Sequence, residues 1–137
     1  KEVYIIDLAN SRHYRNGHIP TSHFSLRTNL ANNIAKISET SRIILTSPDG
    51  INARLAAMET SERDVVVLAG GSKAWEDAGL PLVNGFKDLL DEAIDVWYRP
   101  YDLEEGNEEA MQTYLNWEVD LTKQIEKDGT TEFPEFK

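Results

Sequence analysis

The chain has 137 residues, 40% of them hydrophobic, and a formal net charge of −10 at pH 7. This length suits one globular domain with a buried core. The negative charge argues against nonspecific binding to nucleic acid or to anionic membranes, both of which need clustered Lys and Arg. The sequence has no cysteine, which excludes disulfides, thiolate catalysis and cysteine-ligated metals within the chain.

The first residues and the hydropathy pattern indicate where in the cell the protein is expected. The chain enters a strand-like run directly after Lys1-Glu2, without the pattern of a signal peptide. We therefore expect a fragment of a longer protein. No apolar run reaches the length of a membrane span, and we expect a cytoplasmic location and no membrane partner.

Short apolar runs alternate with helical segments through the first half of the chain. Runs rich in aliphatic and β-branched residues predict strands over residues 3–6, 22–26, 42–46 and 64–69. The segments between and after them predict helices over residues 11–15, 28–37, 53–62 and 72–79. Asn10, Thr28 and Ser72 are the expected N-caps. Strands that alternate with helices pair in parallel through right-handed crossovers. The predicted fold class is therefore α/β, an open, mainly parallel sheet with helices on both faces.

The pattern changes after Gly85. Residues 86–97 have apolar side chains at three- to four-residue spacing, which predicts a helix. Residues 107–127 predict one long helix that Gly129 ends, and its apolar stripe consists of Ala110, Tyr114, Trp117, Leu121 and Ile125. We expect a domain over residues 1–85 and a helical extension over residues 86–137 that packs on this domain or on a neighbour.

The loop after the third predicted strand is the candidate functional site. A strand, a tight loop containing Gly50 and a helix N-terminus follow one another, and such a sequence of elements can bind an anion through backbone amides. The candidate residues are Ser47, Pro48, Asp49, Gly50, Ile51 and Asn52.

Several blocks of the sequence resemble the rhodanese-like (sulfurtransferase) family. YIIDLANSRHYRNGHIPTSHF resembles its opening strand, aspartate and Gly-His-Ile-Pro turn, and LAGGSKAWEDAGLPL its Gly-Gly, Ala-Trp and Gly-Leu-Pro block. The family's loop runs Cys-x-x-Gly-x-Arg; Gly50 matches, Ser47 replaces the cysteine and Asn52 replaces the arginine. Ala9 stands where the family usually has an arginine, two residues after Asp7.

A narrower resemblance involves the C-terminal half. TSPDGINARLAA and the later MQTYLNWEVDLTKQIEKDGTTEF look like the last, cysteine-less repeat of multi-repeat bacterial thiosulfate sulfurtransferases. This resemblance implies a tandem-repeat parent protein. The expected partners are neighbouring rhodanese repeats of the same polypeptide or, in a homo-oligomer, other copies of the chain.

The resemblance implies a degenerate site. The family's chemistry passes through a persulfide on the loop thiolate, which serine cannot form. Asn52 removes a cation that would hold an anionic substrate, and Asp49 adds a negative charge. We therefore expect no catalytic residue, no cofactor and no metal in this chain. The leading hypothesis is a non-catalytic module with a structural or regulatory role in a larger sulfurtransferase.

Two other hypotheses stay open. The parent protein is an active thiosulfate sulfurtransferase whose catalytic cysteine lies in another repeat, or the chain is a binding module for a small anion or a peptide at the loop. A hydrolase triad of Ser47, a histidine and Asp49 is disfavoured because no Gly-x-Ser-x-Gly elbow surrounds the serine. His18 is interpreted as a structural hydrogen bonder in its turn, and Trp75 as a core residue.

Overall fold

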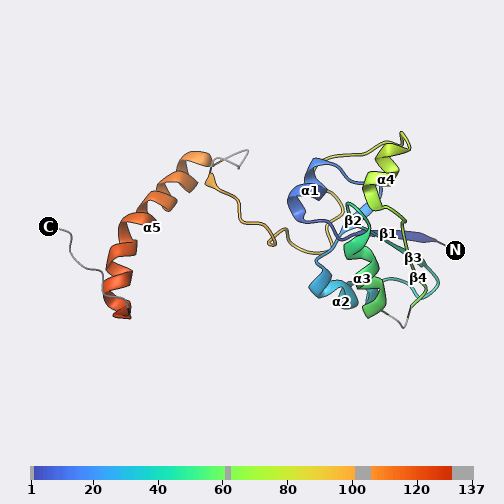
Figure 1. Ribbon diagram of the computed structural model, residues 1–137, viewed down its shortest axis with the longest axis horizontal. Coiled ribbons are helices and arrows are strands. Elements are labelled where there is room, and N and C mark those ends of the chain that lie inside the picture. The colour runs from blue at the N-terminus through green and yellow to red at the C-terminus, as the bar shows by residue number, and fades with distance from the viewer. Residues whose placement is uncertain (1, 61–62, 101–105, 131–137) are drawn as a thin grey trace. The chain divides into compact units, whose positions relative to one another are not determined.

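The computed structural model describes residues 2–60, 63–100 and 106–130. Its strands are β1 (Val3–Asp7), β2 (Ser22–Phe24), β3 (Arg42–Thr46) and β4 (Val65–Val67) (Figure 1). Its helices are α1 (Ser11–Asn16), the 3-10 turn η1 (Arg27–Asn29), α2 (Leu30–Ala35), α3 (Ile51–Glu59), α4 (Gly71–Asp77) and α5 (Asn107–Asp128). The chain divides into two compact units, Lys1–Val96 and Trp97–Lys137.

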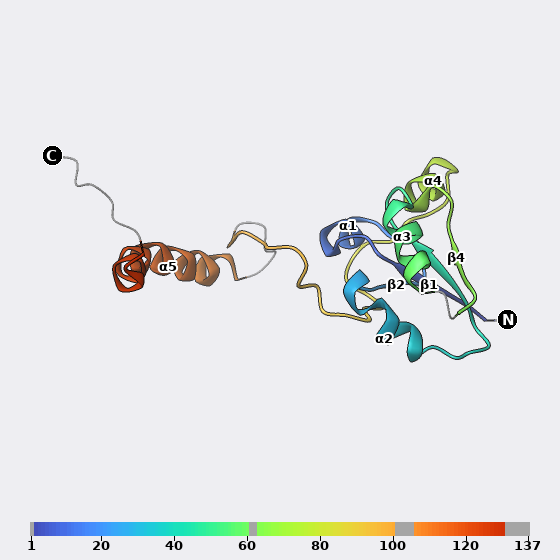
Figure 2. The same cartoon turned by 60° about the horizontal axis from the view of Figure 1, so that its bottom comes forward.

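The four strands form one parallel sheet in the order β2-β1-β3-β4. The central strands β1 and β3 pair along their whole length, with Ile5 opposite Ile44. β4 lies at an edge of this sheet (Figure 2). The predicted α/β class with parallel pairing is confirmed, and the helices between consecutive strands are the crossovers that parallel pairing requires.

Helices cover both faces of the sheet. Residues in register across parallel strands point to the same face, so Ile6 and Leu45 face one side while Phe24, which is in register with Asp7, faces the other. The first side packs against α2 and α3 in a core of Ile6, Leu8, Leu30, Ile34, Ile43, Leu45, Ala53 and Ala56. On the second side Phe24 packs against Tyr14 of α1, with 5.5 Å between ring centroids.

Local signals in the sequence set several element ends. The Asn10 side chain accepts a hydrogen bond from the His13 N–H at 2.8 Å and caps α1 as predicted. Gly129 adopts a left-handed conformation with φ of 61° and ends α5. β2 ends at Phe24, two residues earlier than predicted.

Helix α3 packs through small side chains. It begins at Ile51, directly after the left-handed Gly50, and buries Ala53 and Ala56. Leu55 and Met58 are 47% and 79% exposed. The two alanines let the helix approach the sheet closely, which leaves the longer apolar side chains on its outer surface.

The prediction of a helix over residues 86–97 is wrong. The segment is irregular, and Asp88 has a φ of 55°. Leu89 forms a parallel bridge with Phe24. The Asp91 carboxylate accepts hydrogen bonds from donors over residues 25–33: the Leu26 N–H at 2.7 Å, and the side chains of Ser25, Asn29 and Asn33. These tertiary contacts override the helical spacing of the apolar residues.

Helix α5 is amphipathic in sequence, yet none of its residues is buried. In the predicted stripe, Tyr114 and Leu121 are half-buried, and Trp117 is 51% exposed. Among the described residues, no helix has both the length and the apolar character needed to cross a membrane.

The Gly70-Gly71 turn, where α4 begins, packs directly against the loop that follows β3. An ideal Cβ on Gly71 would lie 1.9 Å from the Ser47 carbonyl oxygen and 2.6 Å from the Gly50 nitrogen. The Ser72 N–H donates to that same carbonyl at 3.1 Å, and the Lys73 N–H donates to the Pro48 carbonyl at 3.0 Å. Glycine is required here both for its positive φ and for the missing side chain.

We predict that Gly71→Ala destabilises the first unit by about 4 kcal/mol or more, because the methyl group collides with backbone atoms that cannot move aside. Gly79→Ala is the matched control. Gly79 also has a positive φ, of 74°, but no atom lies within 4 Å of its ideal Cβ, so only the conformational cost of about 1–2 kcal/mol applies. Urea unfolding of both variants measures the difference, and equal losses would contradict this account of the turn.

Candidate functional site

The six candidate residues follow β3, and the last two of them, Ile51 and Asn52, are the first residues of α3. Ser47 is completely buried. Its Oγ accepts a hydrogen bond from the Ala53 N–H in the first turn of α3, at 3.2 Å. The hydroxyl therefore serves the helix N-terminus, and its oxygen is inaccessible to a substrate in solution.

Oxygen atoms of the loop itself occupy the amides that would hold an anion. The Gly50 N–H donates to the Ser47 carbonyl at 3.2 Å, and the Ile51 N–H donates to the Asp49 carboxylate at 2.9 Å. The Ala53 N–H is taken by Ser47 Oγ. The Asp49 carboxylate thus lies where the positive end of the helix dipole attracts negative charge. An anion binding here would have to displace an internal carboxylate.

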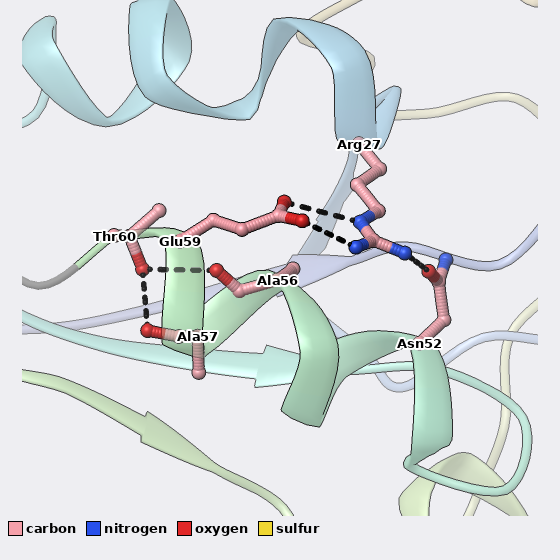
Figure 3. Close-up of polar contacts among 6 residues, drawn as sticks. All are labelled: Arg27, Asn52, Ala56, Ala57, Glu59 and Thr60. Carbon is pink, nitrogen blue, oxygen red and sulfur yellow. Dashed lines mark hydrogen bonds and ion pairs between the residues drawn. The ribbon is translucent and has the colours of Figure 1, made fainter.

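Asn52 points inward and joins the loop to two other elements. Its Nδ2 donates to the Leu8 carbonyl at 2.8 Å, and its Oδ1 accepts from Arg27 Nη1 at 3.2 Å. Arg27 in turn makes two hydrogen bonds to the Glu59 carboxylate, of 2.6 and 3.3 Å (Figure 3). The hydrogen bond from Arg27 lowers the pKa of the Glu59 carboxyl group. The guanidinium beside the loop is therefore already paired with a carboxylate and held by an amide.

A small cavity of about 190 Å³ lies on the outer side of the loop. Its lining includes Pro48 and Asp49 but not Ser47, and it also includes Lys73 and Glu76 of α4. Lys73 forms an ion pair with Asp77 at 3.0 Å. The cavity therefore has carboxylates close to its cation, which suits neither thiosulfate nor another small anion.

His18 has a structural environment, as predicted. It is buried, its ring stacks on Tyr14 with 3.8 Å between ring centroids, and its Nδ1 lies 2.8 Å from the Tyr14 carbonyl oxygen. A carbonyl can only accept, so Nδ1 carries the proton. The backbone of His18 exchanges two hydrogen bonds with Val83, of 2.8 and 2.9 Å. His18 thus ties the turn before β2 to the segment after α4.

Asp7 is a buried carboxyl group at the end of β1. It is 1% exposed, and its Oδ1 accepts a hydrogen bond from the Ala9 N–H at 2.9 Å. Burial raises the pKa of Asp7 to about 6, and the bond from Ala9 opposes this rise only in part. Ala9 occupies the position where the family resemblance implies an arginine.

Of the six predicted residues, Ser47 to Gly50 form the turn after β3, and Ile51 and Asn52 begin α3. None of the hydrogen bonds that Ser47 and Asp49 make in the described residues involves a histidine, so the geometry gives no support to a hydrolase triad. Arg27 and Glu59 were missed by sequence reasoning. They lie 32 residues apart and no motif links them, so only the tertiary fold reveals their contact with Asn52. Trp75 is half-buried and donates from Nε1 to the Pro81 carbonyl at 2.9 Å.

Comparison with known proteins gives the following matches. The family profile described as a rhodanese-like domain matches residues 1–78. A thiosulfate sulfurtransferase from Pseudomonas aeruginosa aligns with 35% identity and a TM-score of 0.83 over 98% of this chain, which spans 26% of that protein. No match is found among curated protein sequences.

More distant structures share the fold alone. A rhodanese-related protein from Thermoplasma volcanium has 18% identity and a TM-score of 0.55, covering 59% of this chain and 83% of that one. A Bacillus halodurans protein has 18% identity and a TM-score of 0.56, covering 72% of each chain. These likenesses show the shared fold, and the match to the family profile over residues 1–78 lies within the first unit.

We predict that Asp7 makes the stability of the first unit depend on pH. Its folded-state pKa of about 6 exceeds the ordinary value of 3.8. The stabilisation from binding a proton is therefore complete below pH 3.8 and is lost as the pH rises through 6. The shift corresponds to about 3 kcal/mol. Asp7→Asn retains an oxygen for the Ala9 N–H, and its unfolding free energy should lack this loss.

The measurement is urea unfolding of wild type and D7N between pH 4 and 8. The stability of wild type relative to D7N should fall by up to about 3 kcal/mol across this range. Asp120→Asn on the exposed surface of α5 controls for the removal of one negative charge. A constant difference between wild type and D7N would show that Asp7 does not titrate in this window.

Proposed function

Since the chain belongs to the rhodanese-like domain family, we propose that it is a non-catalytic module of a larger sulfurtransferase, with a structural or regulatory role. The observation that carries this proposal is the combination of a retained fold with a loop that has no thiol. Ser47 stands in the position of the nucleophile and is completely buried. Its Oγ is engaged by the Ala53 N–H, so neither the atom nor the access that sulfur transfer needs is present.

Two features support a role within a larger protein. The chain spans about a quarter of the Pseudomonas aeruginosa thiosulfate sulfurtransferase that it resembles over nearly its whole length. Helix α5 buries none of its residues, although Met111, Leu115, Trp117 and Val119 are large and apolar. Several large apolar side chains exposed on one helix are typical of an interface. The proposed partners are neighbouring rhodanese repeats or further copies of the chain, in the cytoplasm of a bacterium.

The second candidate is a part of an active thiosulfate sulfurtransferase whose cysteine lies in another repeat. The 35% identity to a thiosulfate sulfurtransferase favours it. The two candidates are compatible, because a module without its own nucleophile can still shape or cover the site of a neighbouring repeat. A cysteine in the corresponding loop of another repeat would support this candidate, and a parent protein without any cysteine would exclude it.

We predict that the wild-type chain transfers no sulfur from thiosulfate to cyanide above the uncatalysed rate. We also expect Ser47→Cys to stay below one hundredth of the activity of S47C/D49G/N52R. The triple variant returns the thiol and the arginine and removes the carboxylate that occupies the Ile51 N–H. A coupled thiocyanate assay measures all three proteins.

The assay has two informative contrary outcomes. Turnover by the wild-type chain would contradict the proposal, because it would require a nucleophile other than a loop thiol. Full activity in S47C alone would leave the proposal intact but would show that the loop still forms an open anion cradle, against the hydrogen bonding described above.

Anion binding at the loop is the third candidate, and the geometry favours it least. Sulfate titrated into the wild-type chain at low salt should give no binding heat, because Asp49 occupies the loop. Asp49→Ala frees the Ile51 N–H and removes the charge, so we expect measurable sulfate binding at least tenfold stronger than in wild type. Glu118→Gln, on α5 in the second unit, is the control for charge alone. Saturable sulfate binding to wild type would support an anion-binding module instead.

A further inference from the structure

The second compact unit contains a cavity of about 780 Å³ that the proposed function does not explain. One wall is a single face of α5, formed by Glu109, Ala110, Thr113, Tyr114 and Trp117. The facing wall comes from the segment before the helix and consists of Trp97, Tyr98 and Pro100, with Gly106 at the helix start. The volume of the cavity is in the range of sites that bind small molecules or peptide segments.

The lining combines aromatic rings with one charge. Four of the nine described lining residues are Trp or Tyr, and Glu109 is the one charged residue among the nine. Trp97 is 70% exposed and Trp117 is 51% exposed, so their ring faces are available to a ligand. The Tyr114 and Trp117 rings lie 6.0 Å apart and are tilted by 38°. The two rings are therefore tilted rather than stacked face to face.

Aromatic rings together with one carboxylate favour binding of a cation that has an apolar surface. The face of an indole or phenol ring carries negative electrostatic potential and attracts ammonium and guanidinium groups. A carboxylate at the edge of the same cavity adds an ion pair, and guanidinium also stacks flat on an aromatic ring. The helix that forms the wall has six acidic residues and two lysines over residues 107–128, so its field attracts a basic partner and repels an acidic one.

We propose that this cavity binds an arginine side chain presented by a protein partner, with the guanidinium between the exposed tryptophan faces and paired with Glu109. The guanidinium would replace water on the Trp97 and Trp117 rings. The apolar rest of the cavity would accept the methylene stem and the neighbouring residues of the partner. This inference does not depend on whether the chain transfers sulfur.

The test uses the full chain and two short peptides that differ in charge alone. One is acetyl-Leu-Arg-Leu-amide, and the other has citrulline, the neutral isostere of arginine, at the central position. The three tryptophan indole N–H signals are followed by NMR during titration at low salt. Trp75 is an internal control, because its indole N–H is hydrogen-bonded to Pro81 in the first unit.

We expect the arginine peptide to shift the Trp97 and Trp117 signals saturably, with millimolar affinity, and to leave Trp75 unchanged. The citrulline peptide should bind at least about tenfold more weakly, since it has no charge for the rings or the carboxylate. Glu109→Gln should weaken the arginine peptide about five- to tenfold without affecting the citrulline peptide. Glu118→Gln, on α5 but outside the cavity, should change neither.

Equal binding of the two peptides would overturn the proposal and would identify the cavity as a plain apolar groove. The absence of saturable shifts at Trp97 and Trp117, or an equal loss in E109Q and E118Q, would also overturn it. Trp117→Ala tests the aromatic contribution separately, because it removes one ring face of the cavity but keeps the charge of Glu109. It should reduce binding of the arginine peptide at least about tenfold while the Trp75 signal keeps its position.

Discussion

The close approach of the Gly70-Gly71 turn to the loop after β3 is the contact on which the site depends. An ideal Cβ on Gly71 would meet the Ser47 carbonyl at 1.9 Å, and the first amides of α4 donate to the carbonyls of Ser47 and Pro48. The loop is therefore fixed from outside by α4 and from inside by its own side chains. Two glycines and a short loop are enough to hold a rigid turn at the end of the parallel sheet, where sites in open α/β folds usually lie.

The same close packing accommodates a loop that has no thiol and whose polar atoms form internal hydrogen bonds. Ser47 Oγ, the Asp49 carboxylate and the Asn52 amide each take a hydrogen bond within the loop or beside it. A buried polar group without a partner costs free energy, so these bonds stabilise the turn. In a catalytic loop the amides would have to remain available to a bound anion. Here they contribute to the stability of the domain itself, which agrees with a module retained for its structure.

Much of the fold could be predicted because local signals agree with the tertiary structure. The apolar runs at β1 and β3, the Asn10 cap and the Gly129 stop all follow short-range rules, and the motif blocks place the loop. The helix predicted over residues 86–97 failed because Asp91 binds donors about sixty residues away, a contact that periodicity cannot reveal. The pairing of Arg27 with Glu59 and Asn52 was out of reach for the same reason.

Reactivity of a thiol placed at position 47 tests the closed loop most directly. Ser47→Cys is treated with a chromogenic disulfide reagent in native buffer and in concentrated urea. Because position 47 is completely buried, we expect the native thiol to react at least about a hundredfold more slowly than the unfolded one. A native thiol that reacts as fast as the unfolded one, or faster, would mean that the loop is open and activating. That result would contradict a structural role for this turn.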